Sequence, residues 1–190
     1  MMIALFFGSF NPIHIGHLVI ADAIALEQEI EKVWFVISPQ NPFKVKESLL
    51  TESARYYLTQ LATEDNPKFF VSNIEFNLPR PNYTIDTLIY LKEKYPDKKF
   101  CLVMGGDNLI HLEKWKNYQM ILENYRIYIY KRPKSDTSQI PSHKNIHFLD
   151  VPLMEVSSTL IRNRLKQKQS IRYLVPEIIR SEIEKGGYYI

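Results

Sequence analysis

The sequence predicts an α/β protein with a Rossmann-like, doubly wound and mostly parallel sheet, helices on both faces and a helical C-terminal segment. Short apolar runs of strand length alternate with longer segments that have helical apolar spacing. Such alternation is typical of parallel sheets joined by crossover helices. The first apolar run also passes through a glycine-containing turn directly into a helical segment. No internal repeat or second domain is visible, so we expect a single domain over residues 1–190.

The N-terminal half contains three short apolar runs, each of the length of a buried strand. We expect strands over residues 3–7, 33–37 and 69–72 and helices over residues 18–26 and 51–62. Thr51 is the expected N-cap of the second helix, because its hydroxyl can accept a hydrogen bond from the first turn. Residues 38–44 follow the second strand and contain two prolines, which stiffen that loop.

The C-terminal half continues the same alternation. We expect strands over residues 100–104, 126–130 and 146–149 and helices over residues 84–95, 118–124, 158–168 and 176–185. Ile85, Leu88, Ile89 and Leu91 lie near one face of the helix over residues 84–95. Pro176 is expected in the first turn of the last helix, which Gly186 and Gly187 end. Residues 131–145 are polar and include two prolines, and we expect a mobile loop there.

Composition excludes several classes of protein. The formal net charge of +3 over 190 residues is too small to indicate nucleic-acid binding. No apolar stretch reaches the roughly 20 residues of a membrane span, and the N-terminus lacks the basic region of a secretory signal, so we expect a cytoplasmic location. The single cysteine, Cys101, excludes an internal disulfide and is expected to be a buried strand residue.

The most informative segment is residues 7–17 (FGSFNPIHIGH), which joins the first strand to the first helix. The carboxyl end of a strand in an open α/β sheet is where nucleotides bind. His14 and His17 flank the helix start and can both face one anion, while the helix N-terminus supplies free N–H groups. Gly8 and Gly16 are expected to let phosphate approach the backbone without a Cβ in the way. A zinc site is less favoured, because no cysteine or third histidine lies nearby.

A second candidate phosphate site lies at Ser157, Ser158 and Arg162. Taken alone, the two serines are explained by ordinary N-capping of the helix that follows. Arg162 lies one turn beyond Ser158 and projects from the same face, so hydroxyls, free amides and a guanidinium would together bind phosphate. Two helix starts directed at phosphates suit a triphosphate better than a single phosphate.

Three weaker signals accompany these segments. Gly105 and Asp107 follow a strand, where Asp107 either caps a helix or accepts hydrogen bonds from a ribose. Thr84, after Tyr83, is best explained as a helix cap. Trp115, the turn at residues 131–133 and Lys44 at the end of the proline-rich loop would together stack on an aromatic ring and bind an acidic group.

Residues 8–17 resemble the signature of the nucleotidyltransferase superfamily with an H-x-G-H motif. The later motifs are similar to those of the bacterial nicotinate mononucleotide adenylyltransferase family and occur in the family's order over nearly the whole chain. They are residues 39–44 (PQNPFK), 82–88 (NYTIDTL), 106–109 (GDNL), Trp115, 131–133 (KRP) and 157–162 (SSTLIR). The chain departs from the family pattern at Asn82, usually serine, at Phe43, often histidine, and at Ala54, often acidic.

The resemblance implies transfer of the adenylyl group of ATP to nicotinate mononucleotide, with Mg²⁺ bound through the ATP phosphates and no metal site of the chain's own. It implies catalytic roles for His14, His17 and Arg162. Residues implied to bind ATP are Gly8, Ser9, Phe10, Gly16, Gly105, Asp107, Ser157 and Ser158, and residues implied to bind the mononucleotide are Asn41, Lys44, Tyr83, Thr84, Trp115 and Arg132. The implied partners are these small molecules, without nucleic acid or membrane, and the oligomeric state stays open, a homo-oligomer included.

Other functions remain open from the sequence. A sibling adenylyltransferase would act on another phosphorylated acceptor, such as phosphopantetheine, flavin mononucleotide or nicotinamide mononucleotide. A nucleotide-binding protein without catalytic activity would keep the fold and bind without turnover. A fragment of an aminoacyl-tRNA synthetase is less favoured, because the chain lacks a K-M-S-K-S stretch.

Overall fold

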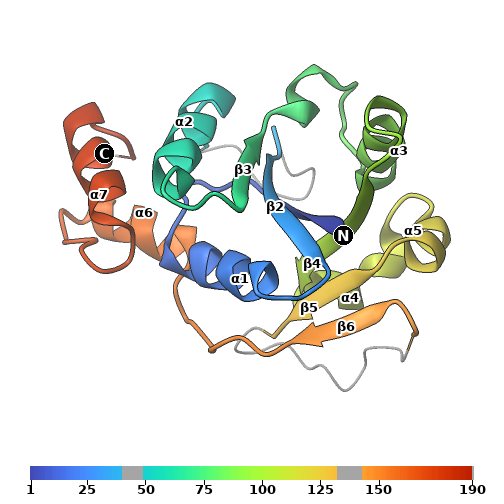
Figure 1. Cartoon of the computed structure of the whole chain (residues 1–190). Coiled ribbons are helices and arrows are strands. Elements are labelled where there is room, and N and C mark those ends of the chain that lie inside the picture. The colour runs from blue at the N-terminus through green and yellow to red at the C-terminus, as the bar shows by residue number, and fades with distance from the viewer. Residues whose placement is uncertain (40–48, 132–142, 190) are drawn as a thin grey trace.

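The computed structural model describes residues 1–39, 49–131 and 143–189. Its centre is a six-stranded sheet in the order β3-β2-β1-β4-β5-β6, in which every neighbouring pair of strands is parallel (Figure 1). The strands are β1 (Met2–Gly8), β2 (Ile30–Ile37), β3 (Phe69–Ser72), β4 (Lys99–Gly105), β5 (Ile127–Tyr130) and β6 (Ile146–Leu149). The chain winds outward from β1 to β3, returns to β4 beside β1, and then winds outward in the opposite direction. The predicted doubly wound parallel sheet is therefore confirmed.

Helices cover both faces of the sheet (Figure 1). They are α1 (Ile15–Ala25), α2 (Glu52–Thr63), α3 (Thr84–Lys94), α4 (Gly106–Ile110), α5 (Tyr118–Asn124), α6 (Ser158–Lys166) and α7 (Glu177–Gly186), with short 3-10 turns η1 (Ile74–Asn77) and η2 (Leu112–Lys114). Ala4 and Phe6 of β1 face the helices α1, α2, α6 and α7. Ile3 and Leu5 face α3, α4 and α5. The period-two alternation of β1 thus supplies both cores, and this double burial explains its continuous apolar run.

Most predicted bounds agree with the structure, and the differences lie at element ends. Thr51 caps α2, accepting a hydrogen bond from the Ala54 amide at 3.3 Å. The expectation that Thr84 caps α3 is wrong, because Tyr83 is the N-cap residue and Thr84 begins the helix. Pro176 likewise immediately precedes α7 instead of lying in its first turn. Ile89 is 44% exposed, so it does not belong to the buried face of α3.

Several further expectations concern the helix starts and the loops. α1 begins at Ile15, which places His17 inside the first turn. Gly187 ends α7 with a left-handed backbone (φ 61°). Most of the expected mobile loop, residues 132–142, lies outside the described residues, as does the proline-rich loop from residue 40. Cys101 is buried as expected, and burial raises the pKa of its thiol to about 12.

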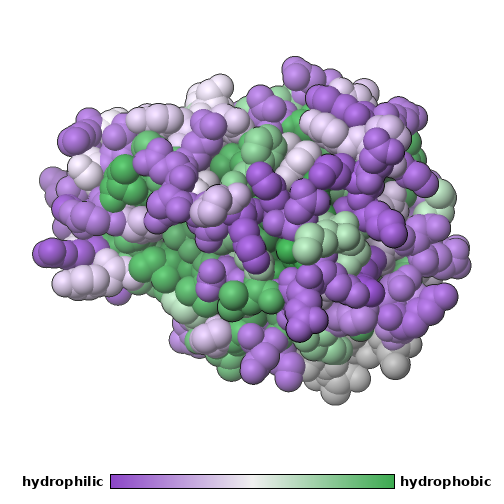
Figure 2. Space-filling view, viewed as in Figure 1, coloured by the Kyte–Doolittle hydropathy of each residue, from purple (hydrophilic) through white to green (hydrophobic). Residues whose placement is uncertain are grey.

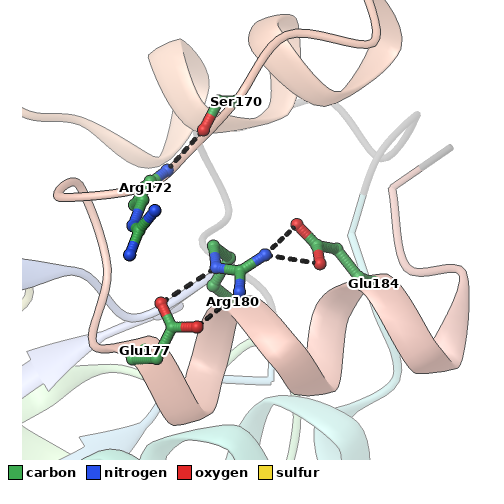
Figure 3. A network of polar contacts seen from close by, with 5 residues as sticks. All are labelled: Ser170, Arg172, Glu177, Arg180 and Glu184. Atoms are coloured by element: carbon green, nitrogen blue, oxygen red, sulfur yellow. Dashed lines mark hydrogen bonds and ion pairs between the residues drawn. The ribbon is translucent and has the colours of Figure 1, made fainter.

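The surface differs between the first and the last helix. Figure 2 shows an apolar area over the position of α1, a helix whose single charged residue is Asp22. α7 instead carries Arg180 between Glu177 and Glu184 on its outer face (Figure 3). Exposed ion pairs of this kind contribute little to stability. The buried residues Ile179 and Ile183 therefore hold α7 against the core that it shares with α2. Among the described residues, no helix is long and apolar enough to cross a bilayer.

Candidate functional site

A cavity of about 690 Å³ lies against residues of β1, β4 and β5 and of the segments that follow them. Because β1 and β4 are neighbours at the point where the strand order reverses, the cavity occupies the usual ligand crevice of a doubly wound sheet. The sequence-predicted residues that line it are Gly8, Ser9, Phe10, His14, Gly16, His17, Thr84, Asp107, Trp115, Ser157, Ser158 and Arg162.

The other predicted site residues either are not among those that line the cavity or lie outside the described residues. Gly105 and Tyr83 are not among the residues that line the cavity, although each directly precedes a helix, α4 or α3, that contributes to it. Tyr83 is 40% exposed, and the Lys116 ammonium lies 5.1 Å from its ring centre. Asn41, Lys44 and Arg132 lie outside the described residues.

The turn after β1 is shaped by ring packing. Phe10 is 1% exposed and has a left-handed backbone (φ 42°), which is uncommon for a residue with a side chain. Its ring packs edge-on against Phe6 and His17, with centroid separations of 5.6 and 5.0 Å. A Cβ at Gly8 would lie 2.8 Å from this ring. Gly8 thus makes room for the Phe10 ring, and close approach of a phosphate at Gly8 stays a prediction.

The two histidines are adjacent at the start of α1. His14 is the N-cap residue and His17 lies in the first turn, and their rings stack with centroids 3.6 Å apart and planes 22° apart. A Cβ at Gly16 would lie 3.1 Å from Nδ1 of His14, so this glycine too makes room for a ring. Both imidazoles therefore border one cavity beside the positive end of a helix dipole.

The start of α6 is joined directly to the turn after β1. The Ser158 hydroxyl donates to the Pro12 carbonyl at 2.9 Å, and Nη1 of Arg162 donates to the Asn11 carbonyl at 2.8 Å. Ser157 is the N-cap residue, and its hydroxyl oxygen accepts from the Leu160 amide at 3.2 Å. Ser157 thus has the ordinary N-capping role that its position before the helix predicts. The two separately predicted segments thus meet at one cavity across about 150 residues of chain.

Arg162 supplies fixed positive charge at this junction. Burial lowers the pKa of the Arg162 guanidinium, and the nearby Tyr189 acts in the opposite direction. A guanidinium nevertheless stays protonated in proteins. The cavity therefore combines a cation, two imidazoles and two helix N-termini, an arrangement that favours a ligand with several negative charges.

Residues of α3 and α4 and Trp115 form another part of the cavity lining. Gly105 is the N-cap residue of α4, so Asp107 lies inside the helix and does not occupy its cap position. Behind α3, the Thr87 hydroxyl donates to the carboxylate of Glu75 at 2.8 Å, and the Asn82 amide group donates to the Glu75 carbonyl at 3.2 Å. These contacts fix the start of α3, from which Thr84 reaches the cavity.

Sequence reasoning missed two kinds of residue. Arg55 is completely buried, and its guanidinium donates to the carbonyl groups of Ser9 at 2.7 Å and Ser38 at 2.8 Å. It also donates to the Pro39 carbonyl at 2.9 Å, so it ties together the ends of β1 and β2.

Asn11 lies within the motif of residues 7–17, but nothing in the local sequence predicted its hydrogen bonds. Residues 151, 152 and 154–156, which precede α6 and are mostly apolar, had no motif that would mark them as cavity lining.

The sequence and the fold were compared with those of known proteins. A family model described as cytidylyltransferase-like matches residues 5–164 of the chain. The chain therefore belongs to the cytidylyltransferase-like family.

Curated relatives narrow the family further. The chain is 49% identical to a protein of Cytophaga hutchinsonii over 100% of this chain and 98% of that protein. It is 48% identical to a protein of Flavobacterium psychrophilum over 100% of this chain and 99% of that protein. Both are named probable nicotinate-nucleotide adenylyltransferases. Identity and coverage of this size place the chain among the nicotinate-nucleotide adenylyltransferases.

Solved structures share the fold at lower sequence identity. The nicotinic acid mononucleotide adenylyltransferase of Plasmodium falciparum, complexed with NaAD, superposes with a TM-score of 0.83 at 21% identity, over 98% of this chain and 96% of that one. A putative nicotinate-nucleotide adenylyltransferase of Vibrio parahaemolyticus has a TM-score of 0.74 at 20% identity, over 97% and 99% of the two chains. These similarities show that the Rossmann-like architecture is shared.

Proposed function

We propose that this protein transfers the adenylyl group of ATP to nicotinate mononucleotide, forming nicotinate adenine dinucleotide and pyrophosphate in NAD biosynthesis. The observation that carries the proposal is the meeting of two helix starts, with His14, His17 and Arg162, at one cavity of about 690 Å³. The names of the relatives support the choice of substrates.

The reaction needs little activation of its nucleophile. A phosphate monoester has a second pKa near about 6, so the mononucleotide phosphate is largely dianionic at neutral pH. One of its oxygens attacks the α-phosphorus of ATP, a new P–O bond forms, and the bond to the β-phosphate breaks as pyrophosphate leaves. Catalysis then depends on alignment and on neutralising charge on the moving phosphates.

We assign the positive groups to successive phosphates. His14 and His17, at the N-terminus of α1, would bind oxygens of the α- and β-phosphates. Arg162, with Ser157 and Ser158 at the start of α6, would bind the β- and γ-phosphates, which form the leaving group. The interaction of Arg162 with the Asn11 carbonyl supports this assignment, because it holds the guanidinium beside the turn that carries the histidines. Gly8, Ser9, Phe10, Gly16, Gly105 and Asp107 complete the proposed ATP side.

The mononucleotide would bind on the side of the cavity formed by α3, α4 and Trp115. Thr84 and Tyr83 at the start of α3 and the Trp115 ring would receive the nicotinate ring. Asn41, Lys44 and Arg132 remain in this proposal as contacts to the acidic groups of the substrate.

A Mg²⁺ ion bound through the ATP phosphates fits the donor groups of the cavity. Such an ion would be held mostly by phosphate oxygens and water, since Mg²⁺ usually keeps several waters and binds through substrate phosphates. Asp107 lines the cavity and would bind the water shell of such an ion. When bound, the ion neutralises charge on the triphosphate.

We also propose that residues 1–190 act as one domain. The C-terminal helices support this, because Ile161, Ile179 and Ile183 belong to the same buried core as Ala4 and Phe6 of β1. The cytoplasmic location stays a prediction from the sequence.

The deciding experiment is an acceptor panel. Purified protein is incubated with Mg·ATP and, separately, nicotinate mononucleotide, nicotinamide mononucleotide, phosphopantetheine or flavin mononucleotide, and pyrophosphate release and the nucleotide products are measured. We expect the highest kcat/KM with nicotinate mononucleotide. Preference for another acceptor would identify a sibling adenylyltransferase. ATP binding without pyrophosphate release for every acceptor would identify a nucleotide-binding protein and contradict the proposal.

A further inference from the structure

Asn11 receives hydrogen bonds from three distant parts of the chain. It is 4% exposed and borders the cavity between Phe10 and Pro12. Its side-chain Oδ1 accepts from the Leu50 amide at 3.2 Å and from the Tyr189 hydroxyl at 2.8 Å. Its main-chain carbonyl accepts from Arg162 at 2.8 Å. The orientation of Asn11 therefore links the turn after β1 to the guanidinium that we assign to the leaving group.

Tyr189 reaches Asn11 because the chain reverses after α7. Gly187 ends that helix in a left-handed conformation, and the Tyr188 amide donates to the Ile183 carbonyl at 3.1 Å. The Tyr189 ring packs against the core formed by α1, α2, α6 and α7. Burial raises the pKa of its hydroxyl, so the group is a hydrogen-bond donor at neutral pH.

The segment before α7 contacts the same region. The Ile15 amide, at the first residue of α1, donates to the Leu174 carbonyl at 3.0 Å. Two separate contacts from the C-terminal segment thus fall on the turn and helix start that carry His14 and His17. Removing the Tyr189 hydroxyl would take away the shorter of the two hydrogen bonds to Asn11 Oδ1 and leave the one from the Leu50 amide. The Leu174 contact and the ring packing would stay in place.

We propose that Tyr189 is a positioning residue for nucleotidyl transfer: its hydroxyl orients Asn11, and through Asn11 it fixes both the histidine-bearing turn and Arg162. This inference deepens the proposed function and rests on it. Tyr189 itself has no assigned contact with substrate. Its hydrogen bond to Asn11 is therefore the contact through which its effect on the turn should be transmitted.

The first test is the variant Tyr189→Phe, which removes the hydroxyl and keeps the ring. Loss of one hydrogen bond of ordinary strength predicts a fall in kcat/KM for ATP of about fivefold to tenfold. We expect the KM for ATP to rise and the KM for nicotinate mononucleotide to stay constant, because the turn borders the proposed ATP side. A merely structural role would reduce the folded fraction, which lowers apparent kcat and leaves both KM values unchanged. The neighbouring variant Tyr188→Phe is the matched control and should keep wild-type kinetics.

A double-mutant cycle tests transmission through Asn11. In the Asn11→Ala background, Tyr189→Phe should change kcat/KM for ATP by less than about twofold, since the acceptor is already gone. Loss of the same factor in both backgrounds would overturn the inference, as would wild-type kinetics of Tyr189→Phe. Loss of cooperative unfolding would show that Tyr189→Phe does not fold. In that case Asn11→Ala alone should show the same rise in the KM for ATP, and an unchanged KM would overturn the inference.

Direct binding separates this inference from the proposed function. The affinity for an ATP analogue is measured by calorimetry for wild type, Tyr189→Phe and Tyr188→Phe. If the wild type releases no pyrophosphate with any acceptor, the proposed function fails. Weaker binding by Tyr189→Phe alone would then still support a positioning role toward nucleotide, and equal binding by all three proteins would overturn it.

Discussion

At the scale of single residues, Arg55 is a charged side chain in a fully buried environment. Its side chain is completely buried and donates to the carbonyl groups of Leu50, Ser9, Ser38 and Pro39 at 2.7–3.0 Å. Burial lowers the pKa of this guanidinium, with Glu52 acting in the opposite direction. Ser9 and Leu50 belong to segments beside the cavity. Ser9, Ser38 and Pro39 directly follow β1 and β2, so Arg55 replaces sheet hydrogen bonds where these strands end.

Replacing Arg55 should therefore destabilise the whole protein. Arg55→Met leaves several buried carbonyl groups without their donor, and each unsatisfied group costs about 1–3 kcal/mol. We expect the free energy of unfolding, measured by urea denaturation, to fall by about 3 kcal/mol or more. Arg172→Met is the control, because Arg172 is exposed and a surface substitution changes stability by about 0.5 kcal/mol or less. Equal denaturation midpoints for Arg55→Met and wild type would contradict the structural role.

His17 should matter for activity and little for stability. Loss of one preorganised phosphate donor costs about 10²–10³ in rate, so we expect His17→Ala to lower kcat by that factor. The melting temperature should stay close to that of wild type. His111→Ala is the matched control, since His111 is exposed and does not line the cavity. Normal turnover by folded His17→Ala would refute the assignment of His17.

Local spacing explains which of these residues the sequence could predict. His14 and His17 are three residues apart at a helix start, and Arg162 lies one turn beyond Ser158, so each set has a periodic signature. Arg55 and Tyr189 act through hydrogen bonds to residues 46 and 178 positions away. No local pattern marks such a contact, because it exists only once the chain is folded.

At the scale of elements, length decided which predictions succeeded. The six strands and the longer helices have enough residues for an apolar period to appear. The helix α4 has five residues and η2 has three. Neither spans much more than one turn, which is too short for a helical period to appear. Both lie between β4 and α5, where they place Asp107 and Trp115 beside the cavity. The part of the site with the weakest sequence signals is thus the part built from the shortest elements.

Gly16 gives a prediction for the start of α1. An alanine there would place its Cβ 3.1 Å from Nδ1 of His14, so the ring must move by a few tenths of an ångström. Misplacement of about 1 Å costs about 10²-fold in rate, and we expect Gly16→Ala to lower kcat/KM about tenfold. Stability should be unchanged or higher, because alanine is favoured over glycine in helices by about 1 kcal/mol.

Activity and stability should thus separate in Gly16→Ala. Steady-state kinetics and thermal denaturation on the same preparation make the comparison. Asp22→Ala, on the exposed side of the same helix, should leave kcat/KM unchanged. Parallel loss of activity and stability in Gly16→Ala would contradict the proposed displacement of His14.

At the scale of the whole molecule, the strand order accounts for the position of the site. β1 lies between β2 and β4, and the chain leaves β1 on one side and returns on the other. The alternation of strands and helices predicted a parallel sheet, and a site at the end of β1 followed from its glycine-containing turn. The order of the strands had no sequence signal, so the neighbours of that turn, β4 and the start of α6, could be known only from the folded chain.

Glu75 is a buried carboxylate whose protonation bears on the stability of the whole fold. It lies in η1, is 3% exposed, and joins α3 to the sheet through the Thr87 hydroxyl at 2.8 Å. Burial raises the pKa of its carboxyl above the ordinary value of 4.5, and hydrogen bonds from Thr87 and Ser38 act in the opposite direction. The folded protein therefore binds the Glu75 proton more tightly than the unfolded chain does.

This difference predicts how stability depends on pH. Between the unfolded and folded pKa values of Glu75, the folded state binds more protons, so the free energy of unfolding falls as pH rises. The contribution is complete below about pH 4.5 and is lost as pH rises through the folded pKa. Glu75→Gln keeps the shape and stays neutral, so urea denaturation at about pH 4.5 and about pH 8 should show the variant gaining stability relative to wild type as pH rises. Glu93→Gln, exposed on α3, controls for removal of a carboxylate. A constant difference between Glu75→Gln and wild type across this range would show that burial of Glu75 does not couple folding to protonation.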